Sequence, residues 1–414
     1  MTRRSSFVFR ILGLASILLL SSPSVAEPER RWEVLYDVHI VPTEGAAHVE
    51  IRLEGYASLV RKMRFRTDRD RHSGFAGDGE IIVSEDGISV TWKPPKTGGA
   101  LRYDFRIDHV RDRARYDARV TTHWALFRGD DLVPPALVDT IDGAPSESRL
   151  HFRLPKGWQV VTPYKRRSDG VFVIEHAHRI FDRPTGWMAA GRLGTLREKV
   201  AGTWVAVSGP TGQGLRRHDM LALLRWTLPT LRNIVGELPA RLLVVSGNDP
   251  MWRGGLSGPN SLFVHADRPL ISRDLTSPLL HELIHTVMAA RSGADGDWIV
   301  EGLAEYYALQ ILVRSRTVSH RRYEKALARL RERGRSVEKL TVAHAHGDVT
   351  AKAVGVLADL DREIRDRTAD KASLDDVVAR LAQFRRPITT KRLRAIVEKI
   401  SGGDFGPFFR RHVS

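Results

Sequence analysis

Two histidines four residues apart flank a glutamate in His281-Glu282-Leu283-Ile284-His285. On a helix, residues four apart differ by about 40° around the axis, so both imidazoles project from one face toward one point. Glu282 lies about 100° from His281 around the helix axis. It can therefore reach a water bound to a metal ion held by the two histidines without being a ligand of that ion. This H-E-x-x-H pattern is typical of zinc hydrolases, in which two histidine ligands have a general base beside them. The alternative interpretation is two structural histidines on an amphipathic helix.

A catalytic zinc site also needs a third protein ligand and an open position for water. Glu301, in the next predicted helix, is the natural third ligand. Glu305 lies one turn further on the same face, where it can accept a hydrogen bond from a ligand imidazole. The residues between these two carboxylates are largely apolar, which argues against the alternative that both are solvated. The sequence therefore predicts a Zn²⁺ site formed by His281, His285 and Glu301.

The two helices together resemble those of the gluzincin peptidases, because H-E-x-x-H is followed by W-x-x-E-G-x-x-x-x-Y over residues 298–307. The resemblance is particularly to the glycyl aminopeptidase family and more distantly to the aminopeptidase N family, and it covers about residues 250–385. It implies that His281, His285 and Glu301 hold zinc and that Glu282 is the general base. It also implies a β domain followed by a thermolysin-like catalytic domain.

The sequence departs from those families at a glycine-rich strand that binds substrate. Gly254, Gly255, Leu256 and Ser257 occupy this segment, and Ser257 stands where the families carry a glutamate that grips the free peptide amine. The missing carboxylate argues against aminopeptidase specificity. It leaves open endopeptidase activity, or another acidic residue that binds the amine.

A second departure concerns the group that stabilises the oxyanion. Thr350 stands where the families begin a helix with a tyrosine. A threonine hydroxyl is shorter and less acidic than a phenol, and losing one oxyanion donor costs about 10²–10³ in turnover. His344 and His346 are candidates to replace the tyrosine, and the alternative is that they are ordinary loop histidines.

The elements that must position these residues indicate an α+β protein. We expect an N-terminal all-β domain over 27–196 and a gluzincin-like catalytic domain over 197–414, divided into a small α/β lobe (197–274) and a helical lobe (275–414). The helix with the H-E-x-x-H motif should start at Ser277-Pro278 and end at Gly293. The alternating or β-branched segments predict strands at Val34–Val41, Val49–Leu53, Ile81–Val83, Ile88–Trp92, Leu101–Ile107, His151–Leu154, Gln159–Thr162, Val171–Ile174, Thr203–Val207 and Arg241–Val245. Apolar spacing of three and four predicts helices at His218–Val235, Ser319–Arg333, Thr350–Arg367, Leu374–Phe384 and Thr390–Ile400.

Composition narrows the function classes. The 414 residues include no cysteine, which excludes disulfide scaffolds, thiol nucleophiles and cysteine-ligated metals. Lysine and arginine number 65 against 49 acidic residues, a net charge of +16. This surplus is spread along the chain, so we expect a generally basic surface and no specific nucleic-acid partner.

The N-terminus carries the signals of export. Three arginines precede an apolar run from Ile11 to Leu20, and small residues follow up to Ala26. This order is typical of a signal peptide over 1–26, cleaved after Ala26. The alternative is a retained membrane anchor, for which the run is short. The mature chain, without a transmembrane segment, would be periplasmic or extracellular.

These observations predict an exported zinc metallopeptidase that acts on a peptide or protein substrate. The alternative, which the residues Ser257 and Thr350 favour, is a catalytically weak or inactive gluzincin-like binding or scaffold protein of the cell envelope. A third hypothesis, based on the positive charge, is an envelope protein that binds an anionic polymer.

Overall fold

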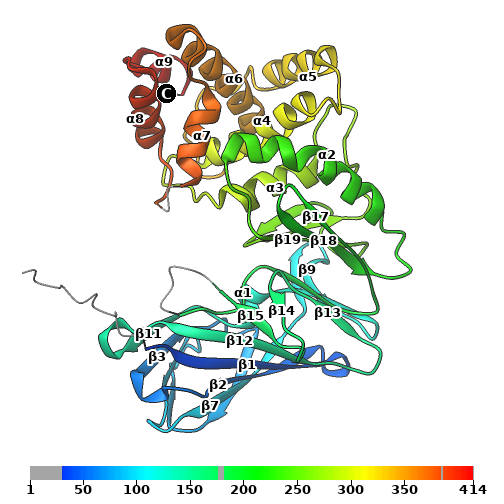
Figure 1. Cartoon of the computed structure of the whole chain (residues 1–414), viewed down its shortest axis with the longest axis vertical. Coiled ribbons are helices and arrows are strands. Elements are labelled where there is room, and N and C mark those ends of the chain that lie inside the picture. Colours follow the sequence, from blue (N-terminus) through cyan, green and yellow to red (C-terminus); the bar gives the residue numbers. More distant parts are fainter. Residues whose placement is uncertain (1–29, 176–180, 384–385, 414) are drawn as a thin grey trace, which may run out of the picture.

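A computed structural model describes residues 30–175, 181–383 and 386–413; the predicted signal peptide lies outside these residues. The chain is a mixed α+β protein in which N-terminal β-sheets are followed by a five-stranded sheet and then by helices. Figure 1 shows these parts stacked in that order, with the N-terminal strands below and the helices above. The predicted fold class is confirmed.

The N-terminal region holds, within the described residues, sheets of seven, five and four strands. Alternation in β1 (Trp32–Val41) places Trp32, Val34, Tyr36 and Val38 in the core and their neighbours outside. The other elements of this region are β2 (Ala46–Leu53), β3 (Val60–Arg66), β4 (His72–Gly77), β5 (Glu80–Val83), β6 (Ser89–Lys93), β7 (Gly99–Arg106), β8 (His109–Asp112), β9 (Arg115–Val120), β10 (Trp124–Arg128), α1 (Gly129–Leu132), β11 (Ala136–Thr140), β12 (Ser146–Arg153), β13 (Gln159–Val161), β14 (Lys165–Arg166), β15 (Phe172–Ile174) and β16 (Trp187–Gly191).

The next sheet has the strand order β17-β18-β19-β21-β20. Its strands are β17 (Leu193–Val200), β18 (Thr203–Pro210), β19 (Arg241–Gly247), β20 (Gly255–Gly258) and β21 (Ser261–His265). The three central strands are parallel, and both edge strands are antiparallel to their neighbours. Strand β17 runs across the expected boundary between residues 196 and 197.

The two faces of this sheet pack against different parts of the molecule. Val205, Val207 and Val244 share a core with the helices, including α2 (Arg217–Val235). Leu243 and Val245 point the other way and pack with side chains of β10 and β16. The sheet is therefore the layer that joins the N-terminal region to the helices.

A loop before β20 also joins the N-terminal region to this sheet. The backbone N–H of Tyr116, in β9, donates to the carbonyl of Pro250 at 3.0 Å, and the N–H of Trp252 donates to the carbonyl of Tyr116 at 2.8 Å. The loop thus continues the pairing of β9 up to the start of β20.

The helices follow the sheet. Ser277 caps α3 (Pro278–Met288) by accepting a hydrogen bond from the N–H of Leu280 at 3.3 Å, as the sequence predicts. The predicted helix end at Gly293 is wrong, because α3 ends at Met288 and Ala289 adopts a left-handed conformation. The N–H of Gly293 instead donates to the carbonyl of Ile388 at 2.6 Å. The remaining helices are α4 (Asp297–Arg314), α5 (His320–Arg333), α6 (Asp348–Thr368), α7 (Leu374–Ala382), α8 (Thr390–Ser401) and α9 (Gly406–His412). Within the described residues, no helix is both long and apolar enough to cross a bilayer.

Two tryptophans give a test of this packing. Trp298 is fully buried in α4, and its indole N–H donates to Thr390 Oγ1 at 3.2 Å. Trp298→Ala should lower the free energy of unfolding by about 3–5 kcal/mol, because a large cavity replaces the ring. Trp226 on α2 is 68% exposed. Trp226→Ala should therefore change the free energy of unfolding by less than about 1 kcal/mol. Urea unfolding measures both, and equal losses would contradict the packing described.

Candidate metal centre

Helices α3 and α4 bring His281, His285 and Glu301 together. The Nε2 atoms of the two histidines lie 3.0 Å apart. Glu301 reaches both of them, with Oε2 3.3 Å from His281 Nε2 and Oε1 3.4 Å from His285 Nε2. One donor atom from each residue lies within 4.8 Å of the others, as expected of a metal-binding group. The predicted convergence of these three side chains is present.

The spacing of these atoms fits a zinc ion. Ligand atoms about 2.0–2.1 Å from zinc in tetrahedral geometry lie roughly 3.4 Å from one another. The observed separations of 3.0, 3.3 and 3.4 Å are close to that value. Two imidazole nitrogens and one carboxylate also form a donor set that zinc hydrolases use. The residues present therefore fit a catalytic zinc site.

Glu305 holds one of the two imidazoles in position. Its Oε2 lies 3.1 Å from Nδ1 of His281, on the side of the ring opposite to the cluster. A hydrogen bond from Nδ1–H leaves the Nε2 lone pair for a metal, which is how carboxylates orient histidine ligands. Glu305 Oε1 is buried and has no hydrogen-bond partner among the described residues.

Charges within the cluster stabilise one another. Burial alone would lower the pKa of His281, but its hydrogen bonds to Glu301 and Glu305 raise it to about 10. Burial would likewise raise the pKa of Glu301, yet the two histidines lower it to about 2. The side chains of His281, His285 and Glu301 are 18%, 14% and 30% exposed. The cluster is thus a polar group in a largely buried position, with Glu301 the most exposed of the three side chains.

Glu282 lies beside the start of β20. A Cβ atom added to Gly255 would lie 2.8 Å from Oε1 of Glu282 and 3.0 Å from its Cδ, so only glycine allows this approach. Burial raises the pKa of Glu282, while the histidines and a hydrogen bond to Ser257 work in the opposite direction. The net rise brings the carboxylate closer to the range of a general base.

The predicted substrate-binding segment forms the edge of the sheet. Gly255, Leu256 and Ser257 belong to β20, which pairs with β21 on one side and ends the strand order on the other. The carbonyl of Gly254 accepts a hydrogen bond from the N–H of His265 at 3.0 Å, extending this pairing. The structure thus places the segment beside Glu282, next to the cluster.

The three candidate oxyanion stabilisers lie at the start of α6 and in the loop before it. Thr350 is half-buried in the first turn of α6, and His344 and His346 are exposed. Within the described residues, none of the three side chains hydrogen-bonds to the cluster. The loop is tied to the start of α4 by a hydrogen bond from the N–H of Ala345 to Asp297 Oδ2 at 2.7 Å. Their proposed role stays a prediction.

A second group of possible metal ligands was not foreseen from the sequence. Asp249, His265 and Asp267 also bring donor atoms within 4.8 Å of one another. However, His265 Nδ1 accepts a hydrogen bond from the N–H of Asp267 at 3.2 Å, which leaves the ring proton on Nε2, 3.5 Å from Asp249. Asp249 is also paired with Arg253. The cluster therefore contains an ion pair between Asp249 and Arg253, and Nε2 of His265 is buried without a hydrogen-bond partner among the described residues.

Comparisons with known proteins identify the fold. No protein-family model and no curated protein matches the sequence. Among solved structures, the chain is similar to an aminopeptidase N family protein from Idiomarina loihiensis, with a TM-score of 0.70 and 15% identity over 92% of this chain and 76% of that chain. It is also similar to an M1 zinc metallopeptidase from Deinococcus radiodurans, with a TM-score of 0.60 and 14% identity over 93% of each chain. The resemblance predicted from the motifs is confirmed at the level of the fold.

The contact between Glu305 and His281 generates a test. Glu305→Gln should weaken zinc binding about 10–100-fold, because a neutral amide orients the imidazole less firmly than a carboxylate does. Glu332, an exposed residue of α5, supplies the matched control Glu332→Gln, which should bind zinc like the parent protein. Competition with a chromogenic chelator measures both affinities. Equal affinities in the two variants would show that Glu305 does not support the site.

Proposed function

We propose that this protein is an exported zinc metallopeptidase that hydrolyses peptide bonds. The observation that carries the proposal is the spacing of His281, His285 and Glu301, which suits tetrahedral zinc, in a chain with the fold of M1 zinc metallopeptidases. Export is proposed from the basic and apolar residues of the predicted signal peptide.

The side chains around the cluster have distinct roles in this mechanism. A zinc ion held there supplies Lewis acidity, which lowers the pKa of water and polarises a carbonyl. Glu282 accepts the proton of the attacking water on its carboxylate and delivers it to the departing amine. Glu305 keeps the Nδ1 proton of His281, so that Nε2 faces the metal.

The edge strand supplies a binding mode for the substrate. An extended peptide that adds to the outer edge of β20 would pair with its backbone and pass Glu282. Ser257 has no negative charge to bind a free amine, and it contributes instead to lowering the pKa of Glu282. The substrate is therefore proposed to be an extended peptide without a required free N-terminus.

A catalytically weak binding or scaffold protein is the second candidate. It is favoured by Thr350, whose short hydroxyl replaces the expected phenol and, in the described structure, has no hydrogen bond to the cluster. Tight zinc binding without cleavage of any peptide would select this function. The presence of Glu282 beside the cluster favours the peptidase.

Catalysis tests the main proposal directly. Purified protein with zinc should cleave members of a peptide library, and a chelator should abolish cleavage. Glu282→Gln should keep the zinc but lower kcat about 10²–10⁴-fold, because the proton acceptor is lost. Mass spectrometry of the products and metal analysis of the same samples provide the two readouts. Cleavage that is equal with and without chelator, or equal in Glu282→Gln, would refute the mechanism.

Blocked peptides test the substrate class. Because Ser257 leaves no carboxylate for a free amine, an N-acetylated peptide should be cleaved with a kcat/KM within a few-fold of its unblocked form. Strong preference for the free amine would show that another acidic group binds it.

The close approach of Gly255 to Glu282 provides a further prediction. Gly255→Ala should lower kcat while leaving zinc affinity unchanged, since the added methyl group displaces the base and not the ligands. Gly403→Ala serves as a control on glycine replacement, because Gly403 has no left-handed backbone and a Cβ there would meet only the end of the Arg367 side chain, at 3.2 Å. Loss of zinc in Gly255→Ala would contradict this assignment.

A further inference from the structure

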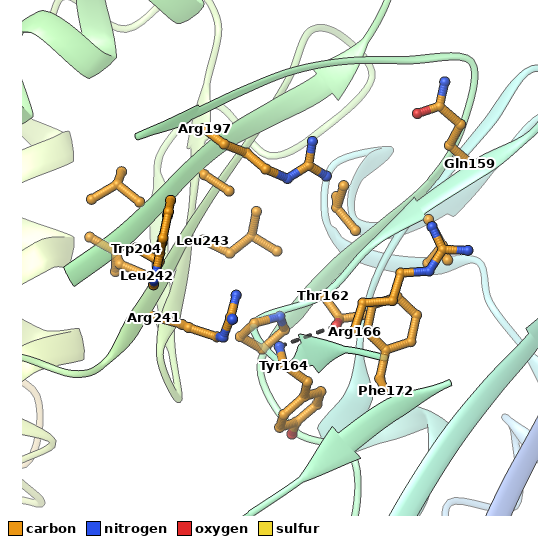
Figure 2. Close-up of a pocket in the computed structure, with 15 residues that line it drawn as sticks. Gln159, Thr162, Tyr164, Arg166, Phe172, Arg197, Trp204, Arg241, Leu242 and Leu243 are labelled. Carbon is orange, nitrogen blue, oxygen red and sulfur yellow. Dashed lines mark hydrogen bonds between the residues drawn. The ribbon is translucent and has the colours of Figure 1, made fainter. Parts of the chain in front are cut away.

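A cavity of about 370 Å³ lies where the five-stranded sheet meets the N-terminal β region. Strands β17, β18 and β19 form one wall, and residues of β13, β14 and β15 form the other (Figure 2). A neighbouring cavity of about 390 Å³ shares Gln159, Arg166 and Arg197 with it and extends the space past Arg166. Volumes of this size are typical of small-molecule sites.

The cavity is separate from the metal centre. It opens on the face of the sheet that bears Leu243, whereas helices α2 and α3 cover the opposite face. The cavity also lies toward β17, at the other edge of the sheet from β20. A ligand there would not occupy the proposed peptide site.

Strand register brings two arginines and a tryptophan to one wall. Trp204 pairs with Arg241 in the next strand and with Lys199 in the preceding one. Arg197 lies two residues before Lys199, so it faces the same side. Figure 2 shows the side chains of Arg197 and Arg241 extending toward the space beside Leu243. Trp204 is 50% exposed, which leaves part of its ring available for contact.

The described side chains that line the first cavity carry positive charge, and Asp169, which lines the neighbouring cavity, is paired with Arg167 at 3.2 Å. No aspartate or glutamate is among the residues that line the first cavity. In the described parts of the chain, Arg197 and Arg241 form no ion pair and no side-chain hydrogen bond. Arg166, on the other wall, contacts the carbonyl of Gly170 at 3.4 Å and lies over the ring of Phe172. By contrast, Glu198 points to the opposite face and pairs with Arg225 of α2.

We propose that this cavity binds a small phosphorylated ligand that carries a planar ring. The guanidinium groups of Arg197 and Arg241, with Arg166 opposite, would bind the phosphate, because guanidinium forms paired hydrogen bonds to phosphate oxygens. The ring would stack on Trp204, and the apolar side chains of Val161 and Leu243 line the same space. The cavity is open to solvent on one side and has a volume of about 370 Å³, which suits a small molecule. This inference does not depend on the proposed peptidase function.

Calorimetry on the full chain tests the proposal with inorganic phosphate, pyrophosphate and adenosine monophosphate as probes. We expect adenosine monophosphate to bind more tightly than inorganic phosphate, because only it has a ring. Arg197→Gln and Arg241→Gln should each raise its dissociation constant about ten-fold or more. Trp204→Ala should weaken adenosine monophosphate binding and leave inorganic phosphate binding unchanged.

Matched controls separate the site from general charge effects. Arg321→Gln removes the same charge from an exposed position on α5 and should leave all dissociation constants unchanged. Because Arg197 and Arg241 have no described partners, their variants should unfold at the same temperature as the parent, and peptide cleavage should be unaffected.

Four results would overturn the proposal. The first is that no probe binds at millimolar concentration, and the second is that Arg321→Gln weakens binding as much as Arg197→Gln does. The third is that Arg197→Gln and Arg241→Gln both leave the dissociation constants unchanged. The fourth is that an acidic polysaccharide binds and the small probes do not.

Discussion

The central constraint on this structure is the placement of two imidazoles and a carboxylate within van der Waals reach of one another in a mostly buried position. Polar groups brought so close need compensating partners, since burying them without partners is costly. The partners here are each other and Glu305, which engages the far side of the His281 ring. Two packed helices maintain this arrangement: α3 is capped by Ser277, and α4 lies so close to α6 that a Cβ on Gly302 would be 2.8 Å from that of Ala353. The apolar core around the helices therefore fixes the relative positions of the polar side chains in the cluster.

The sequence predicted this cluster well because its information is local. Four-residue spacing, a capping serine and a proline in the first turn determine which face of α3 carries both histidines. The end of α3 was predicted wrongly because Gly293 has a tertiary role, a hydrogen bond to Ile388, that no local signal reveals. Several strands, among them β16, β17 and β21, were not predicted. The cavity lined by Arg197 and Arg241 was missed as well, because it depends on tertiary contacts. Arg197, Trp204 and Arg241 become neighbours only through the register of three strands, and that register depends on the whole sheet.

The structure also changes the meaning of one departure from the family pattern. The sequence alone shows only that Ser257 stands where the families it resembles have a glutamate that binds the substrate amine. In the structure Ser257 lies on the strand beside Glu282 and opposes the rise in the pKa of Glu282 that burial causes. Ser257 therefore affects the residue that is proposed as the general base. With Gly255 giving Glu282 room on the same strand, one short edge strand lies beside the residue that is proposed as the general base and beside the proposed path of the substrate.

The pairing of Tyr116 with the loop at Pro250 and Trp252 has a mechanical consequence. Two backbone hydrogen bonds join the segment before β20 to a strand of the N-terminal region. The N-terminal region therefore supports the position of the edge strand β20. A fragment that lacks the N-terminal region would leave the backbone groups of Pro250 and Trp252 without these partners. The segment before β20 would then lose this support. The path along which a peptide is proposed to lie is thus set by residues from both halves of the chain.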